Sequence, residues 1–245
     1  SFPTRRSSDL AEFPQARVIR MDLDTTRRRN AFLEAWRKIE SGQVDVILGT
    51  QMIAKGIHLE QVTVVGVPLA DVSLFQPDFR AAERAFAVLT QVAGRAGRGE
   101  KPGTVYIQTY VPHHYAIGFA RTHDYRGFYD KEIRVRQVLR FPPHYRLIGV
   151  LAVGPDAEST AEKMKEFANL VRNVAFRAQD AVTVLGPTPA AVAKIKDQWR
   201  WRLLLRGTEP SLMRQILREA MARYRELSGH SRVQLHVDVD PHDLV

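Results

Sequence analysis

The alternation of apolar and polar residues divides the first half of the chain into short strands and amphipathic helices. Apolar runs of strand length recur there, and segments with helical spacing lie between them. Strands are expected at Ala16–Met21, Val44–Leu48, Val62–Val67 and Thr104–Gln108, and helices up to Ile39 and from Pro77 through Val92. Strands that alternate with helices predict a doubly wound α/β unit with a parallel sheet over residues 11–112.

The first of these helices also has the signs of a cap and of a buried face. Asp24-Thr-Thr26 offers an N-cap, because a short polar side chain can accept a hydrogen bond from the first free amides of a helix. Its apolar face is expected to consist of Phe32, Leu33, Trp36 and Ile39.

The second half of the chain has a different order of elements. A charged, aromatic connector over residues 113–143, helical in part, ends at Pro142-Pro143, which cannot continue a helix. Beyond it, strands are expected at Arg146–Val153, Val182–Leu185, Trp199–Leu205 and Val233–Val239, with helices at Ala157–Ala178 and Pro210–Leu227. The order β-α-β-β-α-β predicts a smaller, ferredoxin-like α+β domain over residues 144–245. Residues 1–10 show no periodicity, and we interpret them as a non-native or disordered leader.

The composition of the chain indicates which class of partner it could bind. The 245 residues are 44% hydrophobic and 26% charged, as in a water-soluble globular protein, and they contain no cysteine. No apolar run approaches the roughly 20 residues of a membrane helix, so a cytoplasmic location without membrane contact is expected. The formal net charge of +9 favours polyanionic partners such as nucleic acid, although a generically basic domain would have the same composition.

Gln91-Val-Ala-Gly-Arg-Ala-Gly-Arg98 is the most informative segment. If it opens a helix, Gln91, Arg95 and Arg98 fall on one face, and Gly94 and Gly97 let a ligand approach the backbone. Two neighbouring guanidiniums suit a shared polyanion, and phosphoryl transfer uses such groups to stabilise charge. The alternative is a solvated basic helix face with two incidental glycines.

Gly49-Thr-Gln-Met-Ile-Ala-Lys-Gly56 directly follows an apolar strand, where open α/β sheets bind their ligands. Thr50 and Gln51 can donate to phosphate oxygens, and Lys55 adds a positive charge. An ordinary turn between a strand and a helix is the competing interpretation of this segment.

The C-terminal half interleaves cations with aromatic side chains. Lys194 and Lys196 precede Trp199-Arg-Trp-Arg202, so that on a strand the two tryptophans share one face and Arg200 and Arg202 share the other. The tryptophans could stack on bases while the cations hold a nucleic-acid backbone. Alternatively, both tryptophans lie in the core against the helix over residues 157–178. No metal site is expected at Asp238 and Asp240 or at His113 and His114.

Taken in order, the two motifs resemble motifs V and VI of superfamily 2 helicases. Further stretches resemble the PriA family of primosomal replication-restart DNA helicases more specifically. They are Pro77-Asp-Phe-Arg-Ala-Ala-Glu-Arg84, Phe141-Pro-Pro143, Trp199 to Leu205 and Val237-Asp-Val-Asp-Pro241. This resemblance covers the chain from about residue 11 to its end and implies the C-terminal part of such a helicase, with the RecA-like second motor lobe in front of the ferredoxin-like domain.

The resemblance implies a role for each matching residue. Arg98 and Arg95 would reach the terminal phosphate of ATP, which is bound with Mg²⁺ mainly by another lobe. Gln91 would sense the nucleotide, and Gly56 and Gly94 would belong to the same ATP site. Thr50, Gln51 and Lys55 would contact DNA, as would the C-terminal cations Lys194, Lys196, Arg200 and Arg202.

The family's activity is ATP-driven 3′–5′ helicase movement that restarts stalled forks and assembles the primosome. Its expected partners are single-stranded and forked DNA, single-strand-binding protein and other primosome proteins. The chain departs from the family in several ways: it contains no Gly-x-x-x-x-Gly-Lys-Ser/Thr loop, it has His58 where many relatives have an aspartate, and the family's zinc-binding cysteines would lie upstream. We therefore expect the chain by itself to hydrolyse no ATP. A non-catalytic DNA- or protein-binding adaptor with a RecA-like shape is the main alternative, and a P-loop nucleotide kinase is disfavoured.

Overall fold

A computed structural model of the chain describes residues 14–21, 29–49, 62–94, 96, 102–178, 181–228 and 231–242. The chain divides into two compact units. The N-terminal unit comprises Ser1–Leu69 and Ala87–Gln108, and the C-terminal unit comprises Ala70–Phe86 and Thr109–Val245. The boundaries at residues 112 and 143 that the sequence suggested stay predictions. Among the described residues, no helix has the length and apolar character that crossing a membrane requires.

The N-terminal unit begins with a parallel pair of strands. β1 (Val18–Met21) pairs with β2 (Val46–Gly49) from Val18 opposite Val46 to Met21 opposite Gly49. The chain between them includes α2 (Arg29–Glu40), as a parallel connection requires. The pair is fastened at its start by Asp45, whose carboxylate accepts hydrogen bonds from the backbone amide and the guanidinium of Arg17 at 2.8 to 2.9 Å.

The second pair of parallel strands in this unit is β3 (Val64–Val67) with β4 (Thr104–Ile107). Within the described part of the chain, the two pairs form separate two-stranded sheets. The expected parallel pairing is therefore present, whereas a single doubly wound sheet is not seen there. Leu33 does not belong to the buried face of α2, because it is 46% exposed while Phe32, Trp36 and Ile39 are half-buried.

A short helix and a long helix follow β3. α4 (Asp71–Leu74) was not expected from the sequence, and its buried Asp71 accepts hydrogen bonds from the Thr109 hydroxyl and the Tyr110 amide. α5 (Ala81–Ala93) starts four residues later than the proline at 77 suggested, because Asp78 forms its first turn by accepting from the Arg80 amide at 2.8 Å.

The end of α5 corrects one expectation about the Gln91–Arg98 segment. The helix ends at Ala93, and both Gly94 and Ala96 lie in turns. One continuous helix face from Gln91 to Arg98 is therefore not formed. Glycine destabilises helix interiors by roughly 1 kcal/mol relative to alanine, and Gly94 stands where glycine commonly ends a helix.

The connector consists of two helices, α6 (Tyr115–Arg121) and α7 (Tyr125–Val138). Each begins at a side chain that accepts a hydrogen bond from an amide of the first turn: His114 Nδ1 from Ala116, and Asp124 from Gly127. The expectation of a partly helical connector is confirmed.

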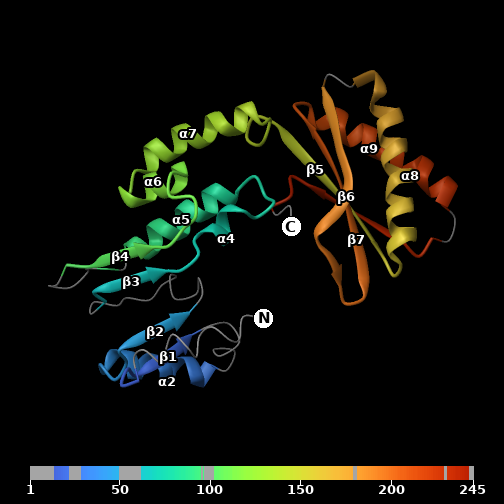
Figure 1. Cartoon of the computed structure of the whole chain (residues 1–245). Coiled ribbons are helices and arrows are strands. Elements are labelled where there is room, and N and C mark those ends of the chain that lie inside the picture. Colours follow the sequence, from blue (N-terminus) through green and yellow to red (C-terminus); the bar gives the residue numbers. More distant parts are fainter. Residues whose placement is uncertain are drawn as a thin grey trace. The chain divides into compact units, whose positions relative to one another are not determined.

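The rest of the C-terminal unit contains four strands and two long helices in the order that the sequence predicts (Figure 1). They are β5 (Arg146–Gly154), α8 (Ala157–Ala175), the 3-10 turn η1 (Phe176–Ala178), β6 (Val182–Ile195), β7 (Gln198–Gly207), α9 (Pro210–Ser228) and β8 (Gln234–Val239). The strands form one antiparallel sheet in the order β6-β7-β5-β8. β6 is ten residues longer than expected and extends into a hairpin with β7.

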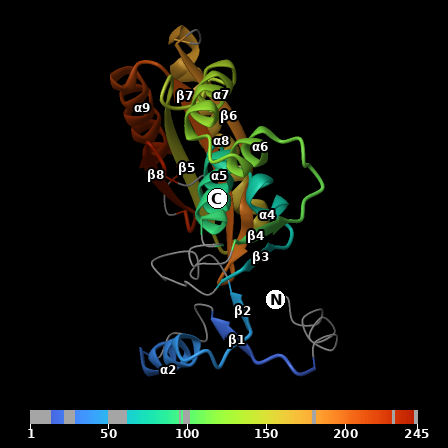
Figure 2. The same cartoon turned by 90° about the vertical axis from the view of Figure 1, so that its left-hand side faces the viewer.

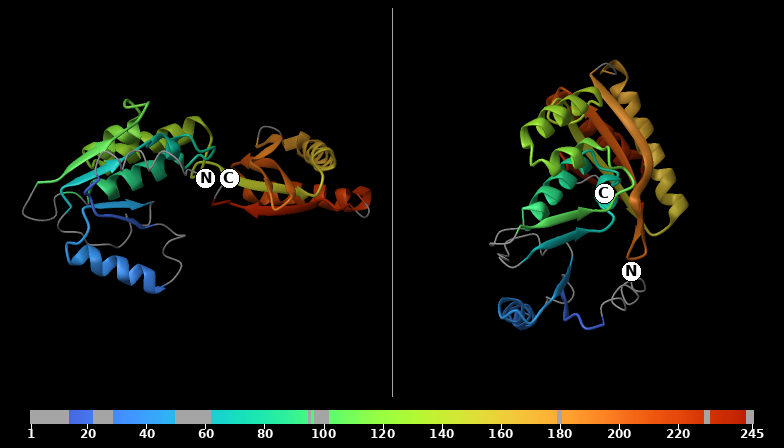
Figure 3. Two further views of the ribbon diagram at one scale, coloured as in Figure 1. Left: turned by 60° about the horizontal axis from the view of Figure 1, so that its bottom comes forward. Right: turned by 60° about the vertical axis from the view of Figure 1, so that its left-hand side comes forward.

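The main hydrophobic core of this sheet lies on the face that the two long helices cover. Buried residues of the strands, such as Val150, Leu203 and Leu205, pack with Phe167 of α8 and Met213 of α9 in a single cluster. Figures 2 and 3 show α8 and α9 together on this side of the sheet. The helices therefore cover one face, and the side chains that alternate with the core positions lie on the opposite face.

Candidate nucleic-acid interface

The β6–β7 hairpin places most of the cations that the sequence singled out in the C-terminal half. Ile195 pairs with Gln198, so the hairpin turns through Lys196 and Asp197 alone. Both residues have positive φ, at 47° and 61°, as a tight two-residue type I′ turn requires. The register shifts between Pro189 and Lys194, which leaves four residues of β6 bulged out of the ladder.

A row of arginines follows β7 on the face opposite the helices. Trp201, Leu203 and Leu205 alternate toward the core, so Arg200, Arg202 and Arg206 alternate away from it. Residues two apart on a strand are separated by about 7 Å, which places the first two guanidinium stems at that spacing and Arg206 two steps further. The sequence analysis named Arg200 and Arg202 but missed Arg206. The same two-residue period could have found it.

These three arginines have no carboxylate in ion-pair distance among the described residues. Arg200 donates to the carbonyl of Val192 at 3.3 Å, and Arg206 donates to the carbonyl of Leu139 at 2.9 Å. The Nε atom of Arg206 is buried and finds no acceptor within the described ranges. A row of cations without carboxylates in ion-pair distance favours an anionic ligand, because each phosphate that binds there neutralises part of the positive charge.

The electrostatics of the row follow from crowding and partial burial. Burial lowers the pKa of Arg202, its neighbour Arg200 lowers it further, and Asp78 opposes both effects. Burial also lowers the pKa of Arg206, with a further decrease from Arg140. An approaching phosphate would relieve the repulsion between Arg200 and Arg202.

The two lysines are placed differently from the arginines. Lys194 lies opposite Trp199, and residues directly opposite in an antiparallel pair share a face, so Lys194 is on the side of the tryptophans. Its ammonium lies 5.5 Å from the centre of the Trp199 ring and 3.0 Å from a carboxylate oxygen of Asp197. Lys196 is exposed at the turn. The structure therefore brings Arg200 and Arg202 together and sets Lys194 apart from them.

The two tryptophans also differ from each other. Trp201 is half-buried and packs against the core cluster, as the structural alternative in the sequence analysis supposed. Trp199 is half-buried beneath Lys194. The tryptophans therefore anchor the strand, and the arginines are the side chains directed outward.

The site residues expected in the N-terminal unit are mostly outside the described ranges. This holds for Thr50, Gln51, Lys55, Gly56, Arg95 and Arg98. Gln91 is half-buried in the last turn of α5, and the amide of Gly94 donates to the carbonyl of Thr90 at 3.0 Å.

Two of the segments that resemble the PriA family meet around Arg136 of α7. Its guanidinium donates to Glu132 at 2.7 Å and to Glu83 at 2.6 Å. It also lies 5.2 Å from the ring centre of Phe79, which stacks on Phe141 at 5.3 Å. Burial alone would lower the pKa of Arg136, but the hydrogen bonds to the two glutamates outweigh it and raise that pKa.

The residues that follow β8 reach the start of α5. Arg80 and Arg84, around the start of α5, both donate to the carbonyl of His242, at 2.7 and 3.2 Å. The family-like residues at 77–84 and 141–143 therefore contact each other and Arg136, and His242, just beyond the segment 237–241, joins the C-terminal end to α5.

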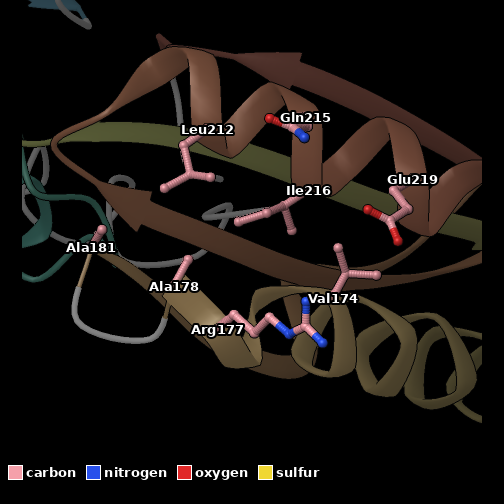
Figure 4. Close-up of a pocket in the computed structure, with 8 residues that line it drawn as sticks. All are labelled: Val174, Arg177, Ala178, Ala181, Leu212, Gln215, Ile216 and Glu219. Carbon is pink, nitrogen blue, oxygen red and sulfur yellow. The ribbon is translucent and has the colours of Figure 1, made fainter.

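Outside the arginine row, two histidine and aspartate positions and one hollow could in principle hold a ligand. His114 caps α6 and Asp240 pairs with Arg146 at 3.5 Å, so these two residues have structural partners. A hollow of about 450 Å³ lies between the end of α8 and the start of α9. Figure 4 shows Val174, Leu212 and Ile216 around it, together with Arg177, Gln215 and Glu219. It belongs to the helical layer and is separate from the arginine row.

These elements make the chain a mixed α/β protein with a basic sheet face. Residues 137–242 match the family model of the primosomal protein N C-terminal domain. The chain is 41% identical over 232 residues to the replication restart protein PriA of Bacillus subtilis, 41% over 230 residues to that of Synechocystis, and 37% over 229 residues to that of Chlamydia trachomatis. Each match covers 94% of this chain.

The chain belongs to the PriA family and corresponds to a C-terminal part of it. It spans 27% to 30% of the length of these three relatives. Among solved structures, the de novo designed protein Foldit4 overlaps 38% of the chain at a TM-score of 0.28 and 12% identity, which is too distant to inform function.

Proposed function

We propose that this chain is the second motor lobe and the DNA-binding end of an ATP-dependent 3′–5′ DNA helicase, which restarts stalled replication forks and assembles the primosome. The observation that carries this proposal is the row Arg200, Arg202 and Arg206 on the sheet face opposite the helices, with no carboxylate in ion-pair distance among the described residues. It occurs in a chain whose relatives are named replication restart proteins.

The architecture supports the proposal in both units. Two parallel strand pairs with helices between them suit a RecA-like lobe. In the C-terminal unit, the second, third, first and fourth strands lie side by side, and two helices cover one face. This is the arrangement that we infer to be ferredoxin-like.

The proposed division of roles follows the resemblance. Arg95 and Arg98, with Gln91, Gly56 and Gly94, would complete an ATP and Mg²⁺ site whose phosphate-binding loop belongs to another lobe. Thr50, Gln51 and Lys55 would contact the single strand. Arg200, Arg202 and Arg206 would hold the backbone of single-stranded or forked DNA, with Lys196 at the hairpin turn and Lys194 beside it.

Further partners and sites follow from the family resemblance alone. We expect single-strand-binding protein and other primosome proteins as partners, in the cytoplasm. Zinc would be held by a part of such a protein upstream of these residues.

The DNA-binding part is tested with the double variant Arg200→Ala/Arg202→Ala. Each lost phosphate contact lowers the slope of log affinity against log salt by about 0.7 for single strands, so the slope should fall by roughly 1.4 and affinity should decrease. The measurement is fluorescence anisotropy of a labelled oligonucleotide over a range of salt concentrations.

Arg214→Ala/Arg218→Ala provides the matched control. Both arginines are exposed on α9, so this variant removes the same charge from the helical layer. An equal loss in the two variants would show that only net charge matters, and the β7 surface would then have no special role.

A measurement of ATP hydrolysis distinguishes the motor hypothesis from the adaptor hypothesis. The 245 residues by themselves should hydrolyse no ATP, because they contain no phosphate-binding loop. Supplying the remainder of the protein should restore DNA-stimulated hydrolysis, and Arg98→Ala should abolish it. Hydrolysis that is indifferent to Arg98, or absent even then, would favour the non-catalytic adaptor.

A further inference from the structure

A continuous series of aromatic rings leads from the interior of the C-terminal unit to its surface. Tyr115 lies 6.0 Å from Phe128, Phe128 stacks on Phe86 at 4.1 Å, and Phe86 lies 6.2 Å from Tyr125. Tyr125 is in turn 6.4 Å from Tyr129. Phe86 and Phe128 are buried, whereas Tyr125 is 67% and Tyr129 51% exposed. The series therefore ends in two tyrosines that present much of their surface to water.

The geometry of this pair is suited to a flat ring. Tyr125 and Tyr129 are four residues apart on α7, so they are neighbours on the helix surface. Their ring centres are 6.4 Å apart and their planes are 31° from parallel. Each ring presents exposed aromatic surface of the kind on which a planar base stacks. Contact with Phe86 restricts Tyr125 before any ligand arrives.

The charges around the pair favour an anionic partner. Arg121 at the end of α6 and Arg126, Lys131 and Arg134 on α7 are exposed and make no ion pair within the described residues. Of the two carboxylates on α7, Glu132 is buried and paired with Arg136, which leaves Asp130, together with Asp124 at the N-cap of the helix, against the four cations. Arg126 is three residues before Tyr129 and therefore adjacent to it on the helix surface.

We propose that Tyr125 and Tyr129 form a stacking site for an unpaired nucleobase, with Arg126 holding the phosphate of the same nucleotide. Aromatic faces bind bases of any sequence, because every base has a π-face, and neighbouring cations hold the backbone. The site takes a different part of the nucleic acid from the β7 row: it binds the base, whereas the row binds phosphates. It rests on the proposed function only in that nucleic acid is the ligand.

The test compares two labelled single strands of equal length, an oligothymidylate and an oligonucleotide in which every base is missing. The chain should bind the strand with bases more tightly. Tyr125→Ser/Tyr129→Ser should reduce affinity for it by about tenfold or more, since each stacked base contributes to binding. Affinity for the abasic strand should stay unchanged. Tyr125→Phe/Tyr129→Phe should bind as the unaltered chain does, because phenylalanine retains the ring.

Two controls complete the design. Tyr110→Ser removes a tyrosine that is 81% exposed elsewhere in the same unit, and it should have no effect on either strand. Arg126→Gln should lower the salt slope by about 0.7 on both strands, whereas Arg214→Gln, which removes an exposed arginine of α9, should not.

Each outcome decides the proposal. If the serine pair binds both strands as the unaltered chain does, the exposed tyrosines serve another purpose, such as contact with a protein, and the proposal is wrong. If the serine pair weakens both strands equally, the effect does not come from bases, and the proposal is again wrong.

If instead the β7 arginines do not bind DNA, the measurements would give a different result. Arg200→Ala/Arg202→Ala would then leave both strands bound as before, while the serine pair would still reduce binding to the strand with bases alone.

Discussion

The two units of the chain differ in how they bury their strands. In the C-terminal unit, four strands share one sheet, and side chains such as Leu203 and Leu205 are fully buried against two helices. In the N-terminal unit, the described strands have four residues each and form two separate pairs. Val64 on β3 is 61% exposed there, and Tyr106 on β4 is 65% exposed.

This difference separates a self-sufficient core from strands whose apolar side chains remain in water. A side chain that is already buried loses its contacts when it is truncated, whereas an exposed one has few to lose. We therefore expect the C-terminal unit to supply most of the cooperative stability of the chain. The proposed motor function gives a reason for the exposed residues, because a second lobe works against another lobe.

The largest contrast is expected between Leu205→Ala and Val64→Ala. Truncation of Leu205, which is 0% exposed, should lower the free energy of unfolding by about 2 to 5 kcal/mol. Truncation of Val64 should change it by less than about 0.5 kcal/mol. Urea denaturation followed by tryptophan fluorescence measures both. Similar losses in the two variants would mean that the N-terminal unit has an equivalent core.

Two glycines, one in each unit, test the same difference between the units, with an expected effect on stability smaller than that of Leu205→Ala. At Gly207 on β7, an added Cβ would lie 2.6 Å from the carbonyl oxygen of Ala181 and 3.2 Å from the sulfur of Met213. At Gly66 on β3, it would meet nothing within 4 Å.

Gly207→Ala should therefore cost about 1 to 3 kcal/mol, because the backbone at residue 181 must move, and Gly66→Ala should be close to neutral. Thermal unfolding of the two variants provides the measurement. A neutral Gly207→Ala would indicate that the junction of β6 and α8 is looser than the structure has it.

The smallest expected effect concerns pH. Burial lowers the pKa of His114, although Glu132 opposes this, and the neutral ring accepts the Ala116 amide that starts α6. As the pH falls below about 6.5, the unfolded chain takes up a proton that the folded chain resists, so stability should decrease. His114→Asn keeps a capping acceptor without a titrating ring and should lose part of this decrease.

The N-terminal unit should behave differently over that range of pH. Hydrogen bonds from Arg17 lower the pKa of Asp45. The stability that this pair contributes is therefore present above the ordinary carboxyl pKa of about 3.9 and is lost only as the pH falls below it. Calorimetry between about pH 7.5 and 5.5 should show a decrease for the C-terminal unit alone, and an unchanged profile in His114→Asn would exclude His114 as the source.

The order of the elements could be predicted from the sequence, because each element has its own local spacing of apolar residues. Helical spacing from Ala157 and from Pro210, and alternation through Trp199 to Leu205, predict the elements that the structure contains. The extension of β6 could not be predicted in this way, since Pro187 and Pro189 argue against a strand. β6 is the edge of the sheet, where a missing amide need not break a ladder, and only the strand order β6-β7-β5-β8 reveals that.

In the candidate interface, too, the sequence predicted the positions of some residues, and tertiary contacts decided those of others. The alternation on β7 was enough to put Arg200 and Arg202 on one face and the tryptophans on the other. Whether that second face was the core depended on where α8 and α9 pack, and the structure assigns Trp201 to the core. Arg206, whose guanidinium reaches Leu139 far away in sequence, and Lys194, placed by the register of the hairpin, likewise depended on tertiary contacts.

The sequence by itself thus determined the types and order of the elements, the family, and the basic character of the chain, because these are properties of neighbouring residues and of composition. The tertiary structure decided which face of each strand is covered, that α5 ends at Ala93, and that two of the family-like segments, 77–84 and 141–143, meet at Arg136. It also set the two exposed tyrosines at the end of a buried aromatic series. These features arise from contacts between residues distant in sequence, and the periodicity of a single segment carries no information about its partner.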